Sequence, residues 1–467
     1  MSTSFAPASP AVPRASGKNG SRGTDEPPGR GGGRRRTRVL IGTDTYPPDV
    51  NGAAYFTARL ARGLAERGAD VHVLCPSASG RPHVVERDGV VEHRLRSMPS
   101  LAHESVSLAL PPGVRGHLNR LLDRLRPDAV HIQNHFLVGR MLANAAHTHG
   151  VPVVATNHFM PENLFDHMRI PEPLRPHMAG LAWWDLGRVL SRVEHVTTPT
   201  PAAAGLLVEQ GFARPVEPVS CGIDLVRFRP VSEGGPGRGS GSETGSGQAE
   251  ERRRIRARLG IPDRRTMLFV GRLDEEKRTD ELIRAVALSH GSSGSSGSVS
   301  SSGAPGIQLL LAGHGAHRGR LAELARAEGV ADRVVFLGFV AHEDLPDVYR
   351  CADVFTIAGI AELQSIATLE AMASGLPVVA ADAMALPHLV EEGRNGYLYP
   401  PGDPAALAAR VASVVSEEAV RARMGAHSRS MASGHRLEDS LKRFEQIYRD
   451  VSVGARTSGA QVGTGRG

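Results

Sequence analysis

The stretch DVFTIAGIAELQSIATLEAMASGLPVVAAD, residues 353–382, contains two apolar segments separated by a helical pattern. Ser365 is a suitable N-cap for the helix, and Gly375 follows its last residue, where glycine commonly ends a helix. The second apolar segment, LPVVAA, has the character of a buried strand. A strand, a helix and another strand at this spacing predict two parallel strands joined by a crossover helix.

The same alternation of apolar strands and amphipathic helices runs through most of the chain. Further strands are expected at RVLIG, DVHVLCP, DAVHIQ, VPVVAT and HVTTPT, and then at TMLFVGR, IQLLLAG, RVVFLGF and GYLYPP. A chain of 467 residues is too long for one ordinary core. We therefore expect an α/β protein of two doubly wound, Rossmann-like domains, joined near residues 216–230, that face each other across a cleft.

Composition indicates where these domains begin and end. Residues 1–36 are rich in Pro, Gly, Ser and Arg, which predicts a disordered basic tail. Two low-complexity segments predict mobile insertions. The expected order is a basic tail (1–36), an N-terminal domain (37–215), a C-terminal domain (216–430) with insertions at 232–248 and 291–306, a C-terminal helix (431–452) and a disordered tail (453–467).

The net charge of +6 does not indicate a nucleic-acid-binding protein. Residues 1–36 hold seven basic and two acidic residues, and residues 453–467 hold two basic residues and no acidic one. The rest of the chain carries a net charge of −1, so a broad basic face is not expected. The basic tail could still contact a polyanion such as an acidic membrane surface.

The sequence contains neither a signal-peptide pattern nor a run of about 18 apolar residues that could span a bilayer. Its cysteines, Cys75, Cys221 and Cys351, are scattered and are not spaced as metal ligands. This pattern favours a reducing compartment and buried, apolar roles for the thiols. We expect a cytoplasmic protein and leave open a peripheral position on the inner face of the membrane.

Two glutamates flank the start of the helix predicted after Ser365. Glu362 precedes the helix, and Glu370 lies in its second turn. The free N–H groups at the helix start favour a phosphate, and Glu370 could accept hydrogen bonds from the paired hydroxyls of a ribose. Two solvent-facing carboxylates are the plain alternative. Because ligands of doubly wound sheets bind at the carboxyl ends of the strands, the position favours a nucleotide diphosphate with an attached sugar.

The segment ELQSIATLEAMASGLPVVA resembles the E-x7-E signature of the family 4 retaining glycosyltransferases, among the group 1 glycosyltransferases, which have the two-domain GT-B fold. The resemblance extends from Arg38 to Tyr448 and includes TYPPDVNGAA, TNHF, VGRLDEEK, LLAGHG and GRNGYLYPPGD. It implies an N-terminal domain for the acceptor and a C-terminal domain for the nucleotide sugar. The two domains would close over the donor and exclude water.

The resemblance also implies roles for individual residues. Glu362 would lie near the transferred sugar, and Glu370 would bind the ribose. Arg272 and Lys277, in VGRLDEEK, would hold the diphosphate and stabilise the negative charge that develops on it as the glycosidic bond breaks. Gly52 would let the backbone approach the donor diphosphate or sugar, although an ordinary turn is the alternative.

The loop after the first glutamate would also contact the donor, through Leu363, Gln364 and Ser365. Many relatives have phenylalanine or glycine there, so contacts to the donor sugar could differ. No D-x-D triplet, which commonly holds the metal of metal-dependent sugar transferases, occurs in the sequence. We predict no metal and no cofactor, because arginine, lysine and a helix end would take the place of a divalent ion.

Histidines follow two strands of the first domain. His158 matches a histidine that, in similar enzymes, contacts the donor sugar or stabilises the reacting centre; a structural histidine is the alternative. His131, Gln133 and His135 alternate along one strand and would share one face. We interpret these three as a wall that faces the acceptor, because no carboxylate or cysteine joins them to make a metal site.

Two segments bear on the nature of the acceptor. Residues 115–126 form a basic amphipathic helix whose leucines favour packing on the sheet over docking on a membrane. Trp183 and Trp184 suggest an apolar acceptor surface.

Together these patterns predict a metal-independent, retaining transferase that moves a hexose, glucose or mannose, from a UDP- or GDP-sugar to a hydroxyl acceptor. A membrane lipid such as diacylglycerol or phosphatidylinositol fits the basic segments, and a soluble sugar or thiol precursor is the rival acceptor. A non-catalytic nucleotide-sugar sensor and a sugar-nucleotide epimerase remain as alternatives. No nucleic-acid partner is expected.

Overall fold

The computed structural model describes residues 36–49, 51–99, 107–109, 113–161, 170–231, 245–291 and 306–463. The predicted basic tail, except Arg36, and most of the two predicted insertions lie outside the described residues. From Thr37 onward the described residues form one compact unit.

The first half of this unit contains an eight-stranded sheet with the order β10-β9-β8-β7-β1-β2-β4-β3. Its strands are β1 (Arg38–Gly42), β2 (Asp70–Pro76), β3 (His83–Arg87), β4 (Val90–Leu95), β7 (Ala129–Ile132), β8 (Val153–Thr156), β9 (His195–Thr198) and β10 (Val216–Pro218). Neighbouring strands pair in parallel, except that β3 runs antiparallel to β4 at the edge. The chain moves outward from β1 in one direction and then in the other, which makes the sheet doubly wound. A two-stranded ribbon, β5 (Ser97–Pro99) with β6 (Ser107–Ala109), follows β4 along the chain.

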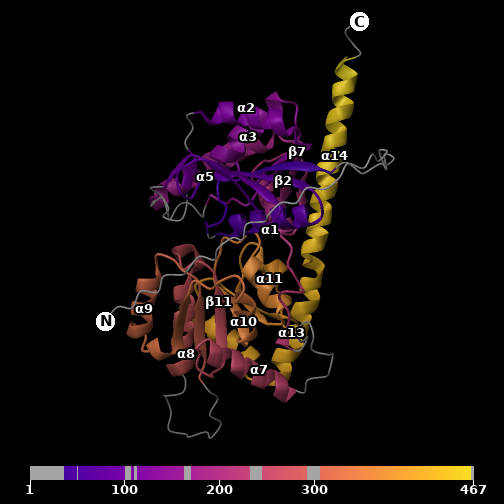
Figure 1. Cartoon of the computed structure of the whole chain (residues 1–467). Helices are drawn as coiled ribbons and strands as arrows, with labels where there is room; N and C mark the ends of the chain where they lie inside the picture. The colour runs from indigo at the N-terminus through magenta and orange to yellow at the C-terminus, as the bar shows by residue number, and fades with distance from the viewer. Residues whose placement is uncertain are drawn as a thin grey trace, which may run out of the picture. The chain divides into compact units, whose positions relative to one another are not determined.

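Helices cover both faces of this sheet. The helices of this half are α1 (Gly52–Glu66), α2 (Val114–Leu125), α3 (Leu137–Thr148), α5 (Arg175–Leu190) and α6 (Pro201–Glu209). Figure 1 shows α2 and α3 on the opposite side of strands β2 and β7 from α1. Leu40 packs in the core under α2, α3 and α5, whereas its neighbours Val39 and Ile41 pack under α1. This split follows from the strand geometry, since successive side chains point to opposite faces.

The second half contains a six-stranded sheet with the order β13-β12-β11-β14-β15-β16, and all its neighbours are parallel. Its strands are β11 (Thr266–Val270), β12 (Gln308–Ala312), β13 (Val334–Gly338), β14 (Val354–Ile357), β15 (Val378–Ala381) and β16 (Gly396–Tyr399). Its helices are α7 (Gly245–Arg258), α8 (Thr279–Gly291), α9 (Arg318–Ala327), α10 (Leu345–Arg350), α11 (Ile366–Ala373), α12 (Pro404–Val415) and α13 (Glu418–Ala432). The strand order is that of a Rossmann sheet, with the reversal of direction between β11 and β14.

Every strand expected from the sequence is present, and the prediction of two doubly wound halves is confirmed. The expected boundary near residue 216 needs a correction, because β10 pairs with β9 and so belongs to the first sheet. Strands β3 and β4 were not expected. They are more polar than the central strands, and only pairing with β2 shows that they extend the sheet.

The last helix, α14 (Leu437–Gly463), returns from the second half to the first. It is the long yellow helix of Figure 1, and its residues Phe444, Ile447 and Tyr448 are buried in the core under α1. The predicted C-terminal helix at 431–452 and the disordered tail from 453 are therefore corrected, since the helix begins at Leu437 and continues to Gly463. Adding a residue to an existing helix costs less free energy than starting a new helix. The helix therefore continues through the glycines of this segment.

Candidate functional site

Helix α11 has the predicted ends. Ser365 Oγ accepts a hydrogen bond from the Thr368 backbone N–H at 3.2 Å, which caps the helix. Gly375, with φ of +75°, follows the last turn in the left-handed conformation that glycine adopts without strain. The helix begins after β14, at the carboxyl edge of the second sheet. The N-cap and the glycine stop predicted from the sequence are thus confirmed.

Glu362, in the loop before α11, is paired with a lysine from another strand end. Its Oε1 atom accepts a hydrogen bond from Lys277 Nζ at 2.7 Å. Gly359 lies beside this pair, and a Cβ atom at that position would come within 3.1 Å of the same carboxylate oxygen. The lysine follows β11 and the glutamate follows β14, which are neighbours in the sheet. The sheet topology therefore brings these two predicted site residues together.

Arg272 joins the same cluster through Glu276. The Oε1 atom of Glu276 lies 2.5 Å from Arg272 Nη2 and 3.4 Å from Lys277 Nζ. Burial by itself would lower the pKa of Lys277, but the charges of Glu362 and Glu276 outweigh it and raise the pKa above its ordinary value. Lys277 is therefore a cation at neutral pH. The sequence analysis did not single out Glu276, although its place directly before the lysine in DEEK is a signal.

Glu370 is almost fully buried and is held by two tyrosines. Its Oε2 atom accepts a hydrogen bond from the Tyr349 hydroxyl at 2.8 Å, and its Oε1 atom accepts one from the Tyr55 hydroxyl at 3.3 Å. Burial raises the pKa of Glu370, and the bond from Tyr349 and the nearby Arg59 oppose that rise. Neither tyrosine was predicted. Tyr55 lies 315 positions from Glu370 in the sequence, and Tyr349 lies on a different helix, α10.

The side chains next to Glu362 have partners inside the protein. The Leu363 carbonyl oxygen accepts a hydrogen bond from Thr200 Oγ1 at 2.8 Å. Gln364 Oε1 accepts one from the Cys221 backbone N–H at 2.7 Å, and Ser365 caps α11. The Leu363 carbonyl and the Gln364 side chain thus fasten the loop to the first half and to the connection between the halves, whereas the Ser365 side chain stays within α11. The donor contacts expected of these three residues stay a prediction.

Gly52 is the exposed first residue of α1, which the Asn51 side chain caps at the Ala54 N–H with a 2.9 Å hydrogen bond. A Cβ atom built at Gly52 would meet no heavy atom within 4 Å. Space is therefore open beside this helix end, which fits the expectation that a ligand can approach the backbone there.

His158 lies at the carboxyl end of β8 and is positioned by Gln133. Its Nε2 atom is 3.0 Å from Gln133 Oε1, and its ring packs 4.9 Å from the ring of Phe56. Burial lowers the pKa of His158 to about 4, so the imidazole is neutral at pH 7. A neutral imidazole can donate its one ring N–H in a hydrogen bond to Gln133. It lacks the second ring proton that an imidazolium would supply as a general acid.

The expected acceptor-facing wall is not formed by its three residues. His131 is fully buried, with its ring nitrogens 2.7 Å from the hydroxyls of Tyr448 and Thr156. His135 is buried between the rings of Phe136 and Phe159, and Gln133 is the partner of His158. The prediction failed because β7 ends at Ile132, so only His131 of the three lies on the strand, where helices over both faces bury it. Gln133 and His135 follow the strand and are buried there against other side chains.

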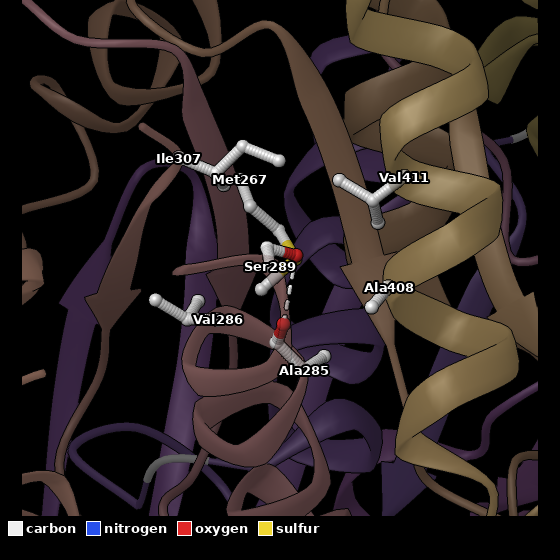
Figure 2. Close-up of a pocket in the computed structure, with 7 residues that line it drawn as sticks. All are labelled: Met267, Ala285, Val286, Ser289, Ile307, Ala408 and Val411. Carbon is white, nitrogen blue, oxygen red and sulfur yellow. Dashed lines mark hydrogen bonds between the residues drawn. The ribbon is translucent and has the colours of Figure 1, made fainter. Parts of the chain in front are cut away.

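Two further features bear on ligand binding. No group of three His, Cys, Asp or Glu side chains able to hold a metal ion occurs in the described ranges. Figure 2 shows a small pocket between β11, α8 and α12, lined by Met267, Ala285, Val286, Ser289, Ile307, Ala408 and Val411. Its one hydroxyl, that of Ser289, donates to the Ala285 carbonyl oxygen at 2.8 Å, so the pocket presents an apolar lining. None of the predicted site residues lines it.

The cysteines and the basic helix follow their sequence predictions. All three cysteines are buried and free. The leucines of α2 are buried in the core, so packing on the sheet is confirmed over docking on a membrane. Among the helices that the structure describes, none is both long and apolar enough to cross a bilayer.

The tryptophan pair divides between the core and the surface. Trp183 is buried, whereas Trp184 is 57% exposed and lies on α5 near other exposed apolar residues. We call this surface the α5 apolar face; it consists of Leu174, Met178, Leu181 and Trp184. The Arg188 guanidinium stands 4.9 Å from the centre of the Trp184 ring. A cation over an indole ring is an attractive arrangement at an exposed site.

Two doubly wound sheets in one chain, with charged side chains in the loops that follow the strands of the second sheet, are the arrangement of the GT-B fold, which is the fold of a class of glycosyltransferases. The family model described as "Glycosyl transferases group 1" matches residues 251–431. The model described as "Glycosyltransferase Family 4" matches residues 50–227.

Similar proteins agree with these matches. A GDP-mannose-dependent alpha-mannosyltransferase from Mycobacterium tuberculosis is 30% identical and covers 78% of this chain and 84% of its own length. A D-inositol 3-phosphate glycosyltransferase from Streptomyces avermitilis is also 30% identical, covering 81% of this chain and 78% of its own length. The solved structure of Anabaena HepE in complex with UDP-glucose matches with a TM-score of 0.67 at 18% identity, covering 89% of this chain and all of that one.

The chain therefore belongs to the family 4, group 1 glycosyltransferases and has the GT-B fold. It is a hexosyltransferase that takes its hexose from a nucleotide sugar. The predicted family, fold and enzyme class are confirmed.

Proposed function

We propose that this enzyme transfers the hexose with retention at the anomeric carbon and without a metal ion, with Arg272 and Lys277 on the diphosphate, Glu362 near the sugar and Glu370 on the ribose. The observation that carries the proposal is the Lys277–Glu362 pair, which Glu276 connects to Arg272. Cations and a carboxylate meet where two neighbouring strands end. Such a place suits an anionic leaving group with a sugar attached.

The chemistry of the proposed transfer follows from these charges. The bond between the anomeric carbon and the diphosphate oxygen breaks, and the acceptor oxygen forms its bond to that carbon from the same face. The acceptor proton passes to the departing phosphate oxygen, so no enzymic nucleophile is needed. Lys277 is already charged in the donor-free protein, and a fixed cation stabilises the leaving diphosphate without reorganisation.

The ribose and diphosphate roles can be separated by two variants. Glu370→Ala should weaken binding of the nucleoside diphosphate about tenfold or more, because a hydrogen-bonding carboxylate is lost. Arg272→Ala should lower kcat about 100-fold with a smaller effect on affinity, because its charge acts most strongly in the transition state. Calorimetry with UDP and GDP and steady-state kinetics would measure the two effects. Wild-type behaviour of both variants would contradict the assignment.

The donor can be found by a screen of thermal shifts with UDP-glucose, GDP-mannose and related sugars. The names of the relatives support either base, since one uses GDP-mannose and a structural neighbour was solved with UDP-glucose. Mass spectrometry of products from lipid and soluble acceptor pools would then identify the acceptor. A donor that binds tightly but gives no product with any acceptor would instead favour a nucleotide-sugar sensor.

A lipid at a membrane surface is the acceptor we propose. The α5 apolar face supports it, because exposed leucines and a tryptophan beside the exposed Arg188 and Arg192 suit the interface of an anionic bilayer. The soluble alternative rests on the relative named a D-inositol 3-phosphate glycosyltransferase.

The double variant Leu181→Ser/Trp184→Ser tests the lipid proposal. It should bind vesicles of phosphatidylcholine and phosphatidylglycerol more weakly than wild type in a flotation assay, because apolar area is removed from the contact. Val208→Ser, which changes a similarly exposed apolar residue on α6, is the matched control and should bind as wild type. Equal binding of all three proteins would contradict a membrane role for α5.

A further inference from the structure

The surroundings of Glu370 contain a contact between the two halves. Tyr55 lies in the first turn of α1, in the first half, and Glu370 lies on α11 in the second half. The Tyr55 hydroxyl is 3.3 Å from Glu370 Oε1 and 3.4 Å from His342 Nδ1, which also belongs to the second half. The ring of Tyr55 meets the ring of His342 edge-on, with 5.3 Å between their centres. Tyr55 therefore reaches from one half into the other.

The two oxygens of Glu370 are occupied unequally. Tyr349 belongs to the same half, is completely buried, and donates to Oε2 over a normal distance of 2.8 Å. Tyr55 is only partly buried and donates to Oε1 over a longer distance of 3.3 Å. A longer bond from a partly buried group of the other half is easier to exchange for a ligand. Oε1 is therefore the oxygen that an incoming hydroxyl group could take over.

Tyr55 is also tied to the chain segment that joins the halves. Arg59, one turn further along α1, places its guanidinium 5.1 Å from the centre of the Tyr55 ring. The Nη2 atom of Arg59 donates to the carbonyl oxygens of Cys221 at 2.6 Å and Gly222 at 2.5 Å. These two residues follow β10, the last strand of the first sheet. A displacement of Tyr55 would thus alter, through Arg59, the contacts of the segment that joins the two halves.

We propose that Tyr55 is a latch whose hydroxyl occupies the position on Glu370 Oε1 that a ribose hydroxyl takes over when a nucleotide binds. The inference rests on the proposed function, in which Glu370 binds the ribose. When a nucleotide binds, a ribose hydroxyl replaces the tyrosine hydroxyl on the same oxygen, so one hydrogen bond to the carboxylate is exchanged for another. Tyr55 is then free to move away from α11. Donor binding and this one hydrogen bond between Tyr55 and Glu370 therefore compete.

The test is the variant Tyr55→Phe in the full-length enzyme, with dissociation constants for UDP and GDP measured by calorimetry. Phenylalanine keeps the ring against Arg59 and His342 but removes the competing hydroxyl. The affinity for the nucleotide that the enzyme binds should rise about fivefold, the size expected from loss of one competing hydrogen bond of ordinary strength, since the 3.3 Å bond from Tyr55 is long. Tyr55→Met, which also lacks a hydroxyl, should show the same direction.

Tyr349→Phe is the matched control. It removes the same chemical group from the other oxygen of Glu370, but here the hydroxyl orients the carboxylate and does not compete with the ligand. Its affinity for the nucleotide should fall. The latch therefore predicts changes of opposite sign for two identical substitutions on one carboxylate, and equal signs would overturn it.

Glu370→Ala separates failure of the latch from failure of the proposed function. If this variant binds UDP and GDP as tightly as wild type, Glu370 does not bind the ribose, and both proposals fall. If Glu370→Ala weakens binding while Tyr55→Phe leaves it unchanged or weaker, the ribose assignment stands and the latch is overturned. A weaker Tyr55→Phe would mean that the hydroxyl binds the nucleotide directly.

Discussion

Lys277 shows how one residue keeps its charge in a largely enclosed place. Only 19% of its side chain is exposed, yet Glu362 at 2.7 Å and Glu276 at 3.4 Å maintain the ammonium form. The same carboxylate that neutralises Lys277 in the donor-free protein is expected to face the sugar. Binding of a diphosphate would therefore bring a third anion to the lysine, beside Glu362 and Glu276.

Lys277→Met is expected to lower kcat about 100-fold, because the leaving diphosphate loses a fixed cation. Steady-state kinetics with the identified donor would measure the change. Arg284→Met is a suitable control, because it also removes the basic partner of a carboxylate. Arg284 pairs with Asp280 at 2.7 Å, at an exposed position on α8. A loss of activity in both variants would point to a general effect on the fold.

His131 predicts a dependence of stability on pH. Burial lowers the pKa of His131 from 6.5 to about 3. Below pH 6.5 this imidazole is therefore protonated in the unfolded chain but stays neutral in the folded protein. The stability it contributes is complete above pH 6.5 and is lost as the pH falls towards 3. Between pH 7.5 and 5 the loss should be about 2 kcal/mol from this residue. Urea unfolding at the two pH values would measure it.

Other groups modify this pH dependence, so the variant His131→Gln is needed as a comparison. His158, whose pKa burial lowers to about 4, acts in the same direction. Burial raises the pKa of Asp44 to about 6, so its contribution is complete below pH 3.8 and is lost as the pH rises through 6. His131→Gln should lose less stability than wild type between pH 7.5 and 5. An equal loss would contradict the role given to His131.

At the scale of the element, α11 is a helix of eight residues whose start is fixed by one side chain. Short helices gain little from their own hydrogen bonds, so the cap and the surrounding core define where α11 begins. That start determines where Glu362 and the backbone N–H groups stand relative to Lys277. The cap could be predicted from the sequence, because a serine before the helical pattern and a glycine after it are local signals.

Ser365→Ala should destabilise the protein by about 1 kcal/mol and also weaken nucleotide binding, because a lost N-cap frees the first turn of α11. Asp403→Ala removes an equivalent cap, since Asp403 Oδ1 accepts from the Ala406 N–H of α12 at 2.9 Å. This control should lose similar stability and keep its affinity for nucleotide. Urea unfolding and calorimetry on both variants would check the pair. Equal nucleotide affinity would show that the start of α11 does not shape the site.

At the scale of the whole molecule, α14 joins the end of the chain to its first sheet. Leu437 lies beside the segment between the halves, where its N–H donates to the Ile223 carbonyl oxygen at 3.0 Å. Further along, Phe444 and Tyr448 fill the core under α1. The buried part of the helix ends near Ser452, whose hydroxyl donates to the Asp128 carbonyl oxygen at 2.6 Å.

Two truncations should therefore behave differently. Removal of residues 453–467 should leave the free energy of unfolding nearly unchanged, because Val453 and Gly454 are exposed. Removal from Leu437 onward deletes Phe444 and Tyr448 from the core, at a cost of about 3–5 kcal/mol for each large aromatic side chain. That loss is comparable with the whole net stability of a typical protein, about 5–15 kcal/mol. Circular dichroism and urea unfolding would distinguish the two, and equal stability would contradict the role of α14.

The sequence alone determined the order of strands and helices, the two doubly wound halves and the cap of α11. These features depend on neighbours a few positions apart, through the periodicity of apolar residues and the chemistry of helix ends. The cluster of Arg272, Lys277 and Glu362 could also be predicted from the sequence. Each residue follows a predicted strand, and neighbouring parallel strands end at the same edge of the sheet.

Only the tertiary structure decided which polar groups meet across long stretches of chain. His131 looked like part of an acceptor wall until Tyr448, 317 positions away, closed over it. Tyr55 finds Glu370 at a separation of 315 positions. The physical reason is that the pattern along a strand shows that a residue points to one face, whereas the helix that returns from the far end of the chain determines whether that face is open or buried.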